Sequence, residues 1–284
     1  MAVQWELLFF SLLVGLGMGC FAFVAVTEWL GKLESIRLPG AITSIICLGI
    51  GGTISALHLG HPERVFHILG NIKSGIAQEF ILSAVAGGLI ALYIVLLLWQ
   101  GASAKARKNV AILGLVAAVL LVFSTGNLYV LGARPAWSTF ILPVLYVAMA
   151  APLGVFAMYI WLVQKGENGE VIQQVNKAAF YGLVAFAVMV ISYVIYLFAA
   201  PFPDPTRSPL RLLAGDLTIL FWGAVVLVGL ITPMLVTFRK MQGQSGNSLL
   251  TVPVTGLMCV LVGSVGMRAI VYLLGTSVHR FIVG

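Results

Sequence analysis

The sequence predicts an all-α integral membrane protein, a bundle of eight transmembrane helices with both termini on the periplasmic side. Of its 284 residues, 61% are apolar and only 9% are charged, and the mean hydropathy is +1.07. A soluble domain of this length carries roughly 25% charged residues. Lipid must therefore be the solvent for most of the chain. We expect one continuous membrane domain over residues 1–284, in a bacterial or archaeal cytoplasmic membrane.

Eight apolar runs are long enough to cross a bilayer as helices, which takes about 20 residues each. Backbone hydrogen bonds in lipid are satisfied only within helices or closed barrels, and runs this continuous exclude a barrel. The N-terminus lacks a basic segment and a small-residue cleavage site, so the first run should be a retained span. The predicted helices occupy about residues 5–28, 39–59, 78–100, 109–131, 138–163, 177–200, 215–238 and 251–274.

Small residues and prolines predict how these helices pack. Gly15 and Gly19 lie one turn apart in the first run, where a neighbouring helix can approach closely. Pro143 and Pro152 each remove an intrahelical hydrogen bond, so the fifth helix should bend. Residues 62–69 begin with proline and are followed by glycine, which predicts a short interfacial helix between the second and third spans.

The distribution of basic residues predicts the orientation, because Lys and Arg are enriched in cytoplasmic loops. The first, third, fifth and seventh loops hold nine of them, and the opposite side holds seven. The N-terminal segment has no base, whereas the first loop has Lys32 and Arg37. We therefore place both termini outside. The net charge of +7 then belongs to loops that touch lipid headgroups, and nucleic-acid binding is not expected.

Ionisable residues gather at the outer ends of the predicted helices, where they are candidates for function. His58 ends the second helix, His61 and His67 follow it, and His279 follows the last helix. Glu79 opens the third helix at about the depth of His58. An imidazole and a carboxylate at the lipid boundary can accept protons as a pair. The alternatives are ordinary interfacial histidines and an acid that favours the positive end of a helix.

Other polar side chains approach the same outer region. Arg268 lies in the outer quarter of the last helix, four residues before Tyr272. Arg134 follows the fourth helix, whose outer end reads Ser-Thr-Gly-Asn-Leu-Tyr over residues 124–129. These groups can line a pocket between the second, third, fourth and eighth helices. Snorkelling arginines and hydroxyls bonded to the backbone are the alternative.

The sequence does not favour a redox cofactor bound by this chain. Cys20, Cys47 and Cys259 lie inside apolar runs without a Cys-x-x-Cys motif, so no iron–sulfur cluster is expected. A membrane b-type haem usually takes two histidines at matching depth, and no run has a histidine at mid-depth. No haem and no metal site are expected, although a single haem near the outer surface, ligated by His58 and another outer histidine, remains an alternative.

One segment resembles a known family. Residues His58-Leu-Gly-His-Pro-Glu-Arg-Val-Phe66 are followed by Asn71-Ile-Lys-Ser-Gly-Ile-Ala-Gln-Glu79. This is similar to the membrane anchor subunit of dimethyl sulfoxide reductase, the DmsC family, in which His-Leu-Gly-x-Pro-x-Arg-x-Phe precedes a glutamate that opens the next helix. Length and number of spans also match. Further echoes are Leu128-Tyr-Val, Pro135-Ala-Trp-Ser138 and Gly266-Met-Arg-Ala-Ile-Val-Tyr272.

The resemblance implies an activity. Such anchors hold a periplasmic molybdopterin catalytic subunit and a four-cluster iron–sulfur subunit against the membrane, and they oxidise menaquinol without haem. It implies that His58 and Glu79 act at the quinol site, while the terminal reductase site lies in another chain. The remaining candidate residues of the quinol pocket are Arg64, Tyr129, Arg134 and Arg268.

Two alternatives remain open. The chain can be the anchor of a related polysulfide- or nitrite-reductase-type complex, with a different acceptor or the opposite direction of electron flow. A small-solute transporter would carry ionisable residues near the bilayer midplane and broken helices there. The ionisable residues of this chain lie instead at the helix ends.

Overall fold

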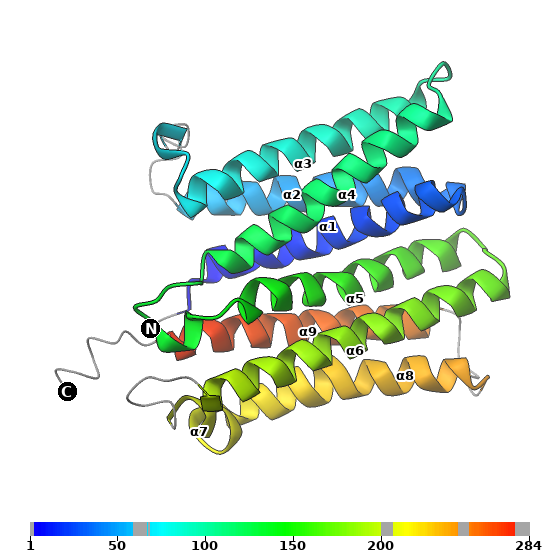
Figure 1. Cartoon of the computed structure of the whole chain (residues 1–284). Coiled ribbons are helices and arrows are strands. Elements are labelled where there is room, and N and C mark those ends of the chain that lie inside the picture. Colours follow the sequence, from blue (N-terminus) through cyan, green and yellow to red (C-terminus); the bar gives the residue numbers. More distant parts are fainter. Residues whose placement is uncertain (1–2, 59–66, 68, 200–206, 244–249, 276–284) are drawn as a thin grey trace.

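The computed structural model describes residues 3–58, 67, 69–199, 207–243 and 250–275. In this part the protein is all-helical, and eight helical segments are long and apolar enough to cross a membrane (Figure 1). The predicted fold class is therefore confirmed. The spans are α1 (Trp5–Leu30), α2 (Arg37–His58), α3 (Gly75–Leu98), α4 (Ala104–Asn127), α5 (Ile141–Gln164), α6 (Gly169–Ala199), η4 with α8 (Ile219–Ile231 and Thr232–Met241) and α9 (Thr251–Leu274).

Three spans begin three to eight residues earlier than predicted, because capping side chains rather than hydropathy decide where a helix starts. Ser74 accepts a hydrogen bond from the backbone N–H of Ala77 and starts α3. Ser103 does the same for α4 through the N–H of Ala106. Asn168 precedes α6 and accepts from the N–H of Val171. The apolar runs locate the membrane-crossing parts, and polar turns extend the helices beyond them.

Short helices connect several spans. They are η1 (Glu34–Ile36), η3 (Pro135–Trp137) and α7 (Arg207–Leu213). The segment α7 lies between the sixth and seventh predicted spans, where no helix was predicted. The predicted interfacial helix over residues 62–69 lies outside the described residues, except for His67 and Leu69.

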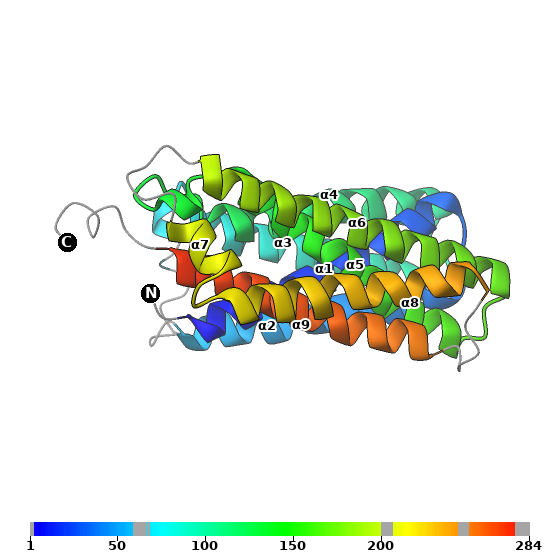
Figure 2. The same ribbon diagram turned by 90° about the horizontal axis from the view of Figure 1, so that it is seen from below.

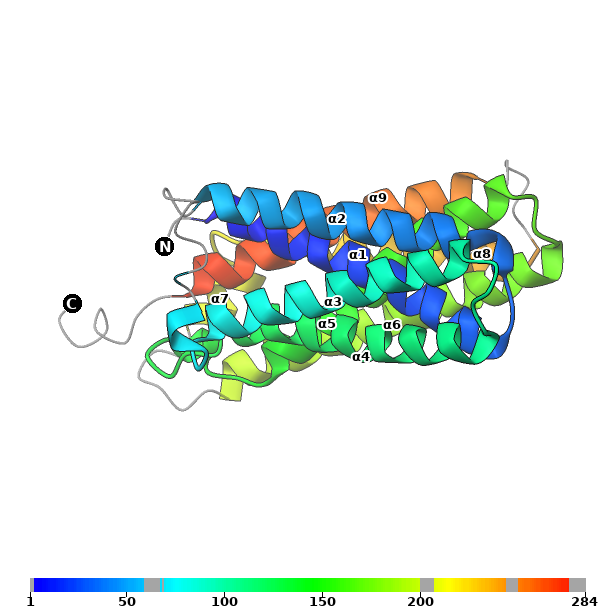
Figure 3. The same cartoon turned by 90° about the horizontal axis from the view of Figure 1, so that it is seen from above.

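The bundle consists of two halves. The first contains α1 to α4, and the second contains α5, α6, η4 with α8, and α9. Figures 1, 2 and 3 show the spans side by side, with successive spans running in opposite directions. The start of α1 and the end of α9 lie at one end of the bundle, which we call the terminal face; the other end is the opposite face (Figure 1).

Helix α1 joins the two halves, because it contacts α2 and α4 on one side and α5 and α9 on the other. Gly19 permits this junction. A Cβ atom at Gly19 would collide with the backbone of Ala150 and Gly154 in α5, so the close approach predicted for this glycine is confirmed. In α5 itself, Pro143 lies in the first turn, where no intrahelical N–H bond is needed, and only Pro152 interrupts the helix interior.

Candidate functional site

The terminal face brings together most of the described candidate residues. Glu79 comes from α3, Tyr129 follows α4, Arg134 precedes η3, and Arg268 lies in α9. His58 is the last residue of α2, but its side chain lies outside the described residues, as do all of Arg64, His61 and His279. His67 is described and exposed. The geometry of the site therefore rests on the acid, the aromatic residues and the two other arginines.

Glu79 is buried in the bundle although it carries a carboxylate. It is the fifth residue of α3, one turn deeper than predicted, and only 9% of its surface is exposed. Its Oε1 atom has no hydrogen-bond partner among the described residues. Ser74 caps the helix in its place, so a role at the helix end does not explain this acid. A buried acceptor without a partner is costly and calls for a ligand, a proton or a water molecule.

Four aromatic side chains pack against one another near the terminal face; we call Tyr129, Trp137, Tyr146 and Tyr272 the aromatic cluster. The ring of Tyr129 stands edge-on to those of Trp137 and Tyr272, each with centroids 5.3 Å away. The hydroxyls of Tyr129 and Tyr272 share a hydrogen bond of 2.6 Å. Burial and the neighbouring tyrosines hold the pKa of Tyr129 well above its ordinary value. Its hydroxyl therefore stays protonated.

Glu79 belongs to the same region as the aromatic cluster. It is close enough to act electrostatically on the hydroxyls of Tyr146 and Tyr272. The Tyr146 hydroxyl is buried and, like Glu79 Oε1, has no hydrogen-bond partner among the described residues. The site thus offers one acceptor and one hydroxyl, both unsatisfied and both enclosed. Sequence analysis missed Tyr146, because nothing in the apolar run of α5 distinguishes it from an ordinary core tyrosine.

The connection after α4 is held firmly in place. Tyr193 donates to the carbonyl of Ala136 at 2.9 Å, and Tyr196 contacts the carbonyls of Pro135 and Ser138 at 2.7 and 2.8 Å. Trp137 Nε1 donates to the carbonyl of Val271 at 2.6 Å. These bonds fix the aromatic cluster between α6 and α9.

Arg134 lies over this fixed turn. Its guanidinium carbon is 4.3 Å from the centroid of the Trp137 ring, and NH1 donates to the carbonyl of Gly275 at 3.2 Å. The cation–π contact and the carbonyl bond attach the turn to the end of α9. The side chain thus presents a positive charge at the terminal face.

Arg268 is fully buried, and its side chain contacts α1 and α5 as well as its own helix α9. Its Nε donates to Ser11 Oγ at 3.1 Å and its NH2 to the Ser11 carbonyl at 3.2 Å, both in α1. Its NH1 reaches the Ser264 carbonyl at 3.3 Å and Met149 Sδ at 3.6 Å. The guanidinium also lies 4.9 Å from the Tyr146 ring centroid. Its partners are neutral, so Arg268 brings a positive charge beside Tyr146.

A second buried polar cluster, which sequence analysis missed, lies at the opposite face; we call Glu28, Arg37, Tyr93 and Arg107 the Glu28 cluster. Glu28 Oε2 pairs with Arg37 NH1 at 3.0 Å and accepts from the Tyr93 hydroxyl at 2.8 Å. Arg107 Nε lies 3.7 Å from Glu28 Oε1. These contacts join α1, α2, α3 and α4. The acid was overlooked because it falls at the end of an apolar run.

The described residues contain no group of three or more His, Cys, Asp and Glu side chains that could hold a metal ion. Cys20 and Cys47 are buried thiols, and Cys259 is half-buried. Three of the four histidine side chains fall outside the described part, so the surface-haem alternative is not tested by this structure.

Comparison with known proteins identifies a matching family. A family model described as "Polysulphide reductase, NrfD" matches residues 1–278, which include all eight spans. No curated protein matches the chain. The match covers both halves of the bundle, including the Glu79 region and the Glu28 cluster.

Proposed function

Because the chain belongs to the polysulphide reductase NrfD family, whose members are membrane subunits of oxidoreductase complexes, we propose that it is the quinol-oxidising anchor of a molybdopterin and iron–sulfur complex. The anchor role follows from the family. The quinol, its site and the identity of the partner subunits are the proposal.

One observation carries the choice of site: the buried carboxylate of Glu79 has an oxygen without a partner among the described residues, and it acts electrostatically on the buried Tyr146 hydroxyl, which also lacks a partner there. A quinol carries hydroxyl groups that donate and accept hydrogen bonds, so it can satisfy both atoms. The surrounding rings of the aromatic cluster suit a flat quinone ring. The residues present therefore fit a quinol as substrate.

Oxidation of a quinol releases two electrons and two protons. In our proposal Glu79 Oε1 accepts a proton from the bound hydroxyl, and His58 accepts the hydrogen bond or proton at the other side, as the resemblance to the dimethyl sulfoxide reductase anchors implies. Tyr146 donates to the substrate oxygen and orients the ring. Arg268 adds a fixed positive charge next to Tyr146, which favours electron-rich oxygen at that position.

The proposed partners dock at the terminal face, which we place in the periplasm from the distribution of basic residues. The two electrons pass from the substrate to the nearest cluster of a four-cluster iron–sulfur subunit and from there to the molybdopterin subunit. Arg134 and Arg64 are proposed to hold the iron–sulfur subunit. The bonds that fix the Pro135–Trp137 turn provide a stable surface for that contact.

The test compares two activities of the complex purified with its natural partners. Glu79→Gln keeps the shape of the side chain but cannot accept a proton, so oxidation of a menaquinol analogue should fall by about a hundredfold or more. Reduction of the terminal acceptor with an artificial electron donor should stay unchanged. His58→Ala should behave in the same way.

Glu170→Gln is the matched control, because Glu170 is an exposed acid at the opposite face. It should leave both activities at the wild-type level. The proposal is wrong if Glu79→Gln and His58→Ala oxidise the quinol analogue at the normal rate while the complex remains intact.

The resemblance and the family match suggest different catalytic partners. The His58–Glu79 segment resembles dimethyl sulfoxide reductase anchors, which makes an S-oxide reductase our first proposal. The description of the family favours a polysulfide reductase complex as the second. Purifying the chain with its partners and measuring which acceptor the complex reduces will decide between them. A visible spectrum of the same sample tests the expected absence of haem.

A further inference from the structure

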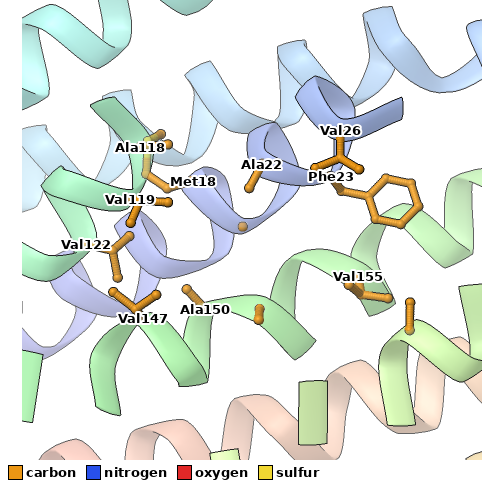
Figure 4. A pocket seen from close by; sticks show the side chains of 13 residues that line it. Met18, Ala22, Phe23, Val26, Ala118, Val119, Val122, Val147, Ala150 and Val155 are labelled. Atoms are coloured by element: carbon orange, nitrogen blue, oxygen red, sulfur yellow. The ribbon is translucent and has the colours of Figure 1, made fainter. Parts of the chain in front are cut away.

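A pocket of about 340 Å³ lies in the seam between the two halves of the bundle (Figure 4). Met18 and Ala22 of α1 form its floor, Val122 lies on the α4 side, and Val147 and Ala150 lie on the α5 side. Figure 4 shows these side chains facing one another across the seam. Neither the proposed quinol chemistry nor the Glu28 cluster involves any of them.

The chemistry of the pocket restricts what it can bind. Its lining consists of alanine, valine, glycine, phenylalanine and methionine, so no side chain offers a nitrogen or oxygen atom to a ligand. All lining residues belong to the membrane-spanning helices α1, α4, α5 and α6, where hydrocarbon is the solvent. The volume lies within the range of about 300–1,000 Å³ that is usual for small-molecule sites. A hydrocarbon chain fits these conditions, and a polar headgroup does not.

The packing of α4 on α5 determines from which side a hydrocarbon chain can enter the pocket. Near the terminal face the two helices touch, and a Cβ atom at Gly126 would lie only 2.5 Å from the Cα of Pro143. Toward the opposite face α4 crosses α1 and leaves α5 (Figure 1). At that side the pocket is lined by Val26, which is 45% exposed, and by the exposed Ala178 of α6. The pocket is therefore closed toward Glu79 and open toward the other leaflet.

We infer that this seam pocket binds one acyl chain of a phospholipid from the leaflet at the opposite face. The exposed Lys177 precedes Ala178 in α6 and supplies a positive charge for the phosphate, reached by snorkelling. An acyl chain bound there fills the space between the two halves of the bundle. Small side chains such as that of Ala22 leave this space empty. The contact of Gly126 with Pro143 separates it from the tail of a quinol bound near Glu79, so this inference is independent of the proposed function.

The experiment uses the purified complex in nanodiscs that contain phosphatidylethanolamine with a photoreactive diazirine in the middle of one acyl chain. After illumination, mass spectrometry maps the labelled peptides. The seam peptides of α1 and α5 should be labelled several-fold more than lipid-facing stretches such as the one around Ile191, which is 58% exposed. Ala22→Phe should reduce seam labelling at least fivefold because the ring fills the pocket.

Two further variants keep the test decisive. Ala91→Phe adds the same ring to an exposed position of α3 outside the seam, and labelling should remain at the wild-type level. Ala151→Phe blocks the pocket from an exposed position and should reproduce Ala22→Phe if that variant folds poorly. Quinol oxidation should persist in the blocked variants.

Three results would overturn the inference: even labelling of all lipid-facing helices, seam labelling that both blocking variants leave unchanged, or seam labelling by a photoreactive quinone with an isoprenoid tail but not by the phospholipid.

Discussion

Neutralising Glu28 should weaken the first half of the bundle substantially, because this acid is buried among partners from three other helices. Glu28 is 1% exposed, and its carboxylate is shared by Arg37 at 3.0 Å, Tyr93 at 2.8 Å and Arg107 at 3.7 Å. Glu28→Gln removes the buried counter-ion of Arg37 and leaves it only the exposed Glu34, whose carboxylate is well screened by solvent. Breaking a buried pair in this way costs about 3–5 kcal/mol. Tyr93→Phe removes only one hydrogen bond to a charged acceptor, which is worth about 1.5–3 kcal/mol.

The matched control is Glu34→Gln, because Glu34 also pairs with Arg37, at 3.2 Å, but its side chain is 79% exposed. Such a pair contributes at most about 1 kcal/mol. Reversible unfolding of the purified chain in bicelles measures the free energy of unfolding of the three variants. We expect the loss to decrease in the order Glu28→Gln, Tyr93→Phe, Glu34→Gln. A Glu28→Gln loss no larger than that of the control would refute the reasoning.

The remaining predictions concern packing, the buried arginine and a surface ion pair. Gly19→Ala should lower the thermal midpoint of unfolding, because the added Cβ meets the α5 backbone. Gly49→Ala should raise the midpoint slightly, because Gly49 has open space around it in a helix. A shift of the same sign in both variants would contradict this reasoning. Arg268→Lys should cost about 1.5–3 kcal/mol, because one ammonium cannot bond Ser11 and Ser264 together; wild-type stability would exclude the assigned role. The hydrogen bond from Arg211 at 2.7 Å lowers the pKa of Asp216. The pair therefore stabilises the fold at pH values above the ordinary aspartate pKa of about 3.9. This stabilisation is lost as the pH falls through the lowered pKa of the folded state. Asp216→Asn should therefore show a small deficit, below about 1 kcal/mol, at pH 7 but none in strong acid; a deficit that persists in acid would argue against the pair.

The sequence was sufficient to predict the architecture, because a helix that crosses lipid needs a long apolar run and such runs are visible in the sequence. Each of the eight runs became a span. The ends were harder to place, since Ser74, Ser103 and Asn168 start helices in polar segments that hydropathy treats as loops. Hydropathy indicates where the chain enters the lipid, whereas capping residues determine where the helix starts.

The candidate site was predictable only in part. Glu79 and Tyr129 were selected because polar groups at helix ends are rare in such a chain. The structure places Tyr129 in the aromatic cluster and Glu79 close enough to act electrostatically on it. Tyr146 was not selected, since its importance depends on a hydroxyl that lacks a partner among the described residues, which is a property of three-dimensional packing. Glu28 was missed for a related reason. Its partners come from three other helices, and no spacing along the chain connects them.

The bonds from Arg268 to Ser11 connect the last span to the first, 257 positions apart. During synthesis, α1 enters the membrane long before Arg268, which needs Ser11 of α1 as a hydrogen-bond partner. An arginine in a lone helix costs up to about 2.5–3.5 kcal/mol to insert, the value for the helix centre, and less toward the helix end where Arg268 lies. Until α9 packs against Ser11, no hydrogen bond to α1 offsets that cost, and the polar atoms of Ser11 lack the arginine as their donor. We therefore expect maturation to end with this step, so that truncated chains lacking α9 persist as open, protease-sensitive forms that quality control can recognise.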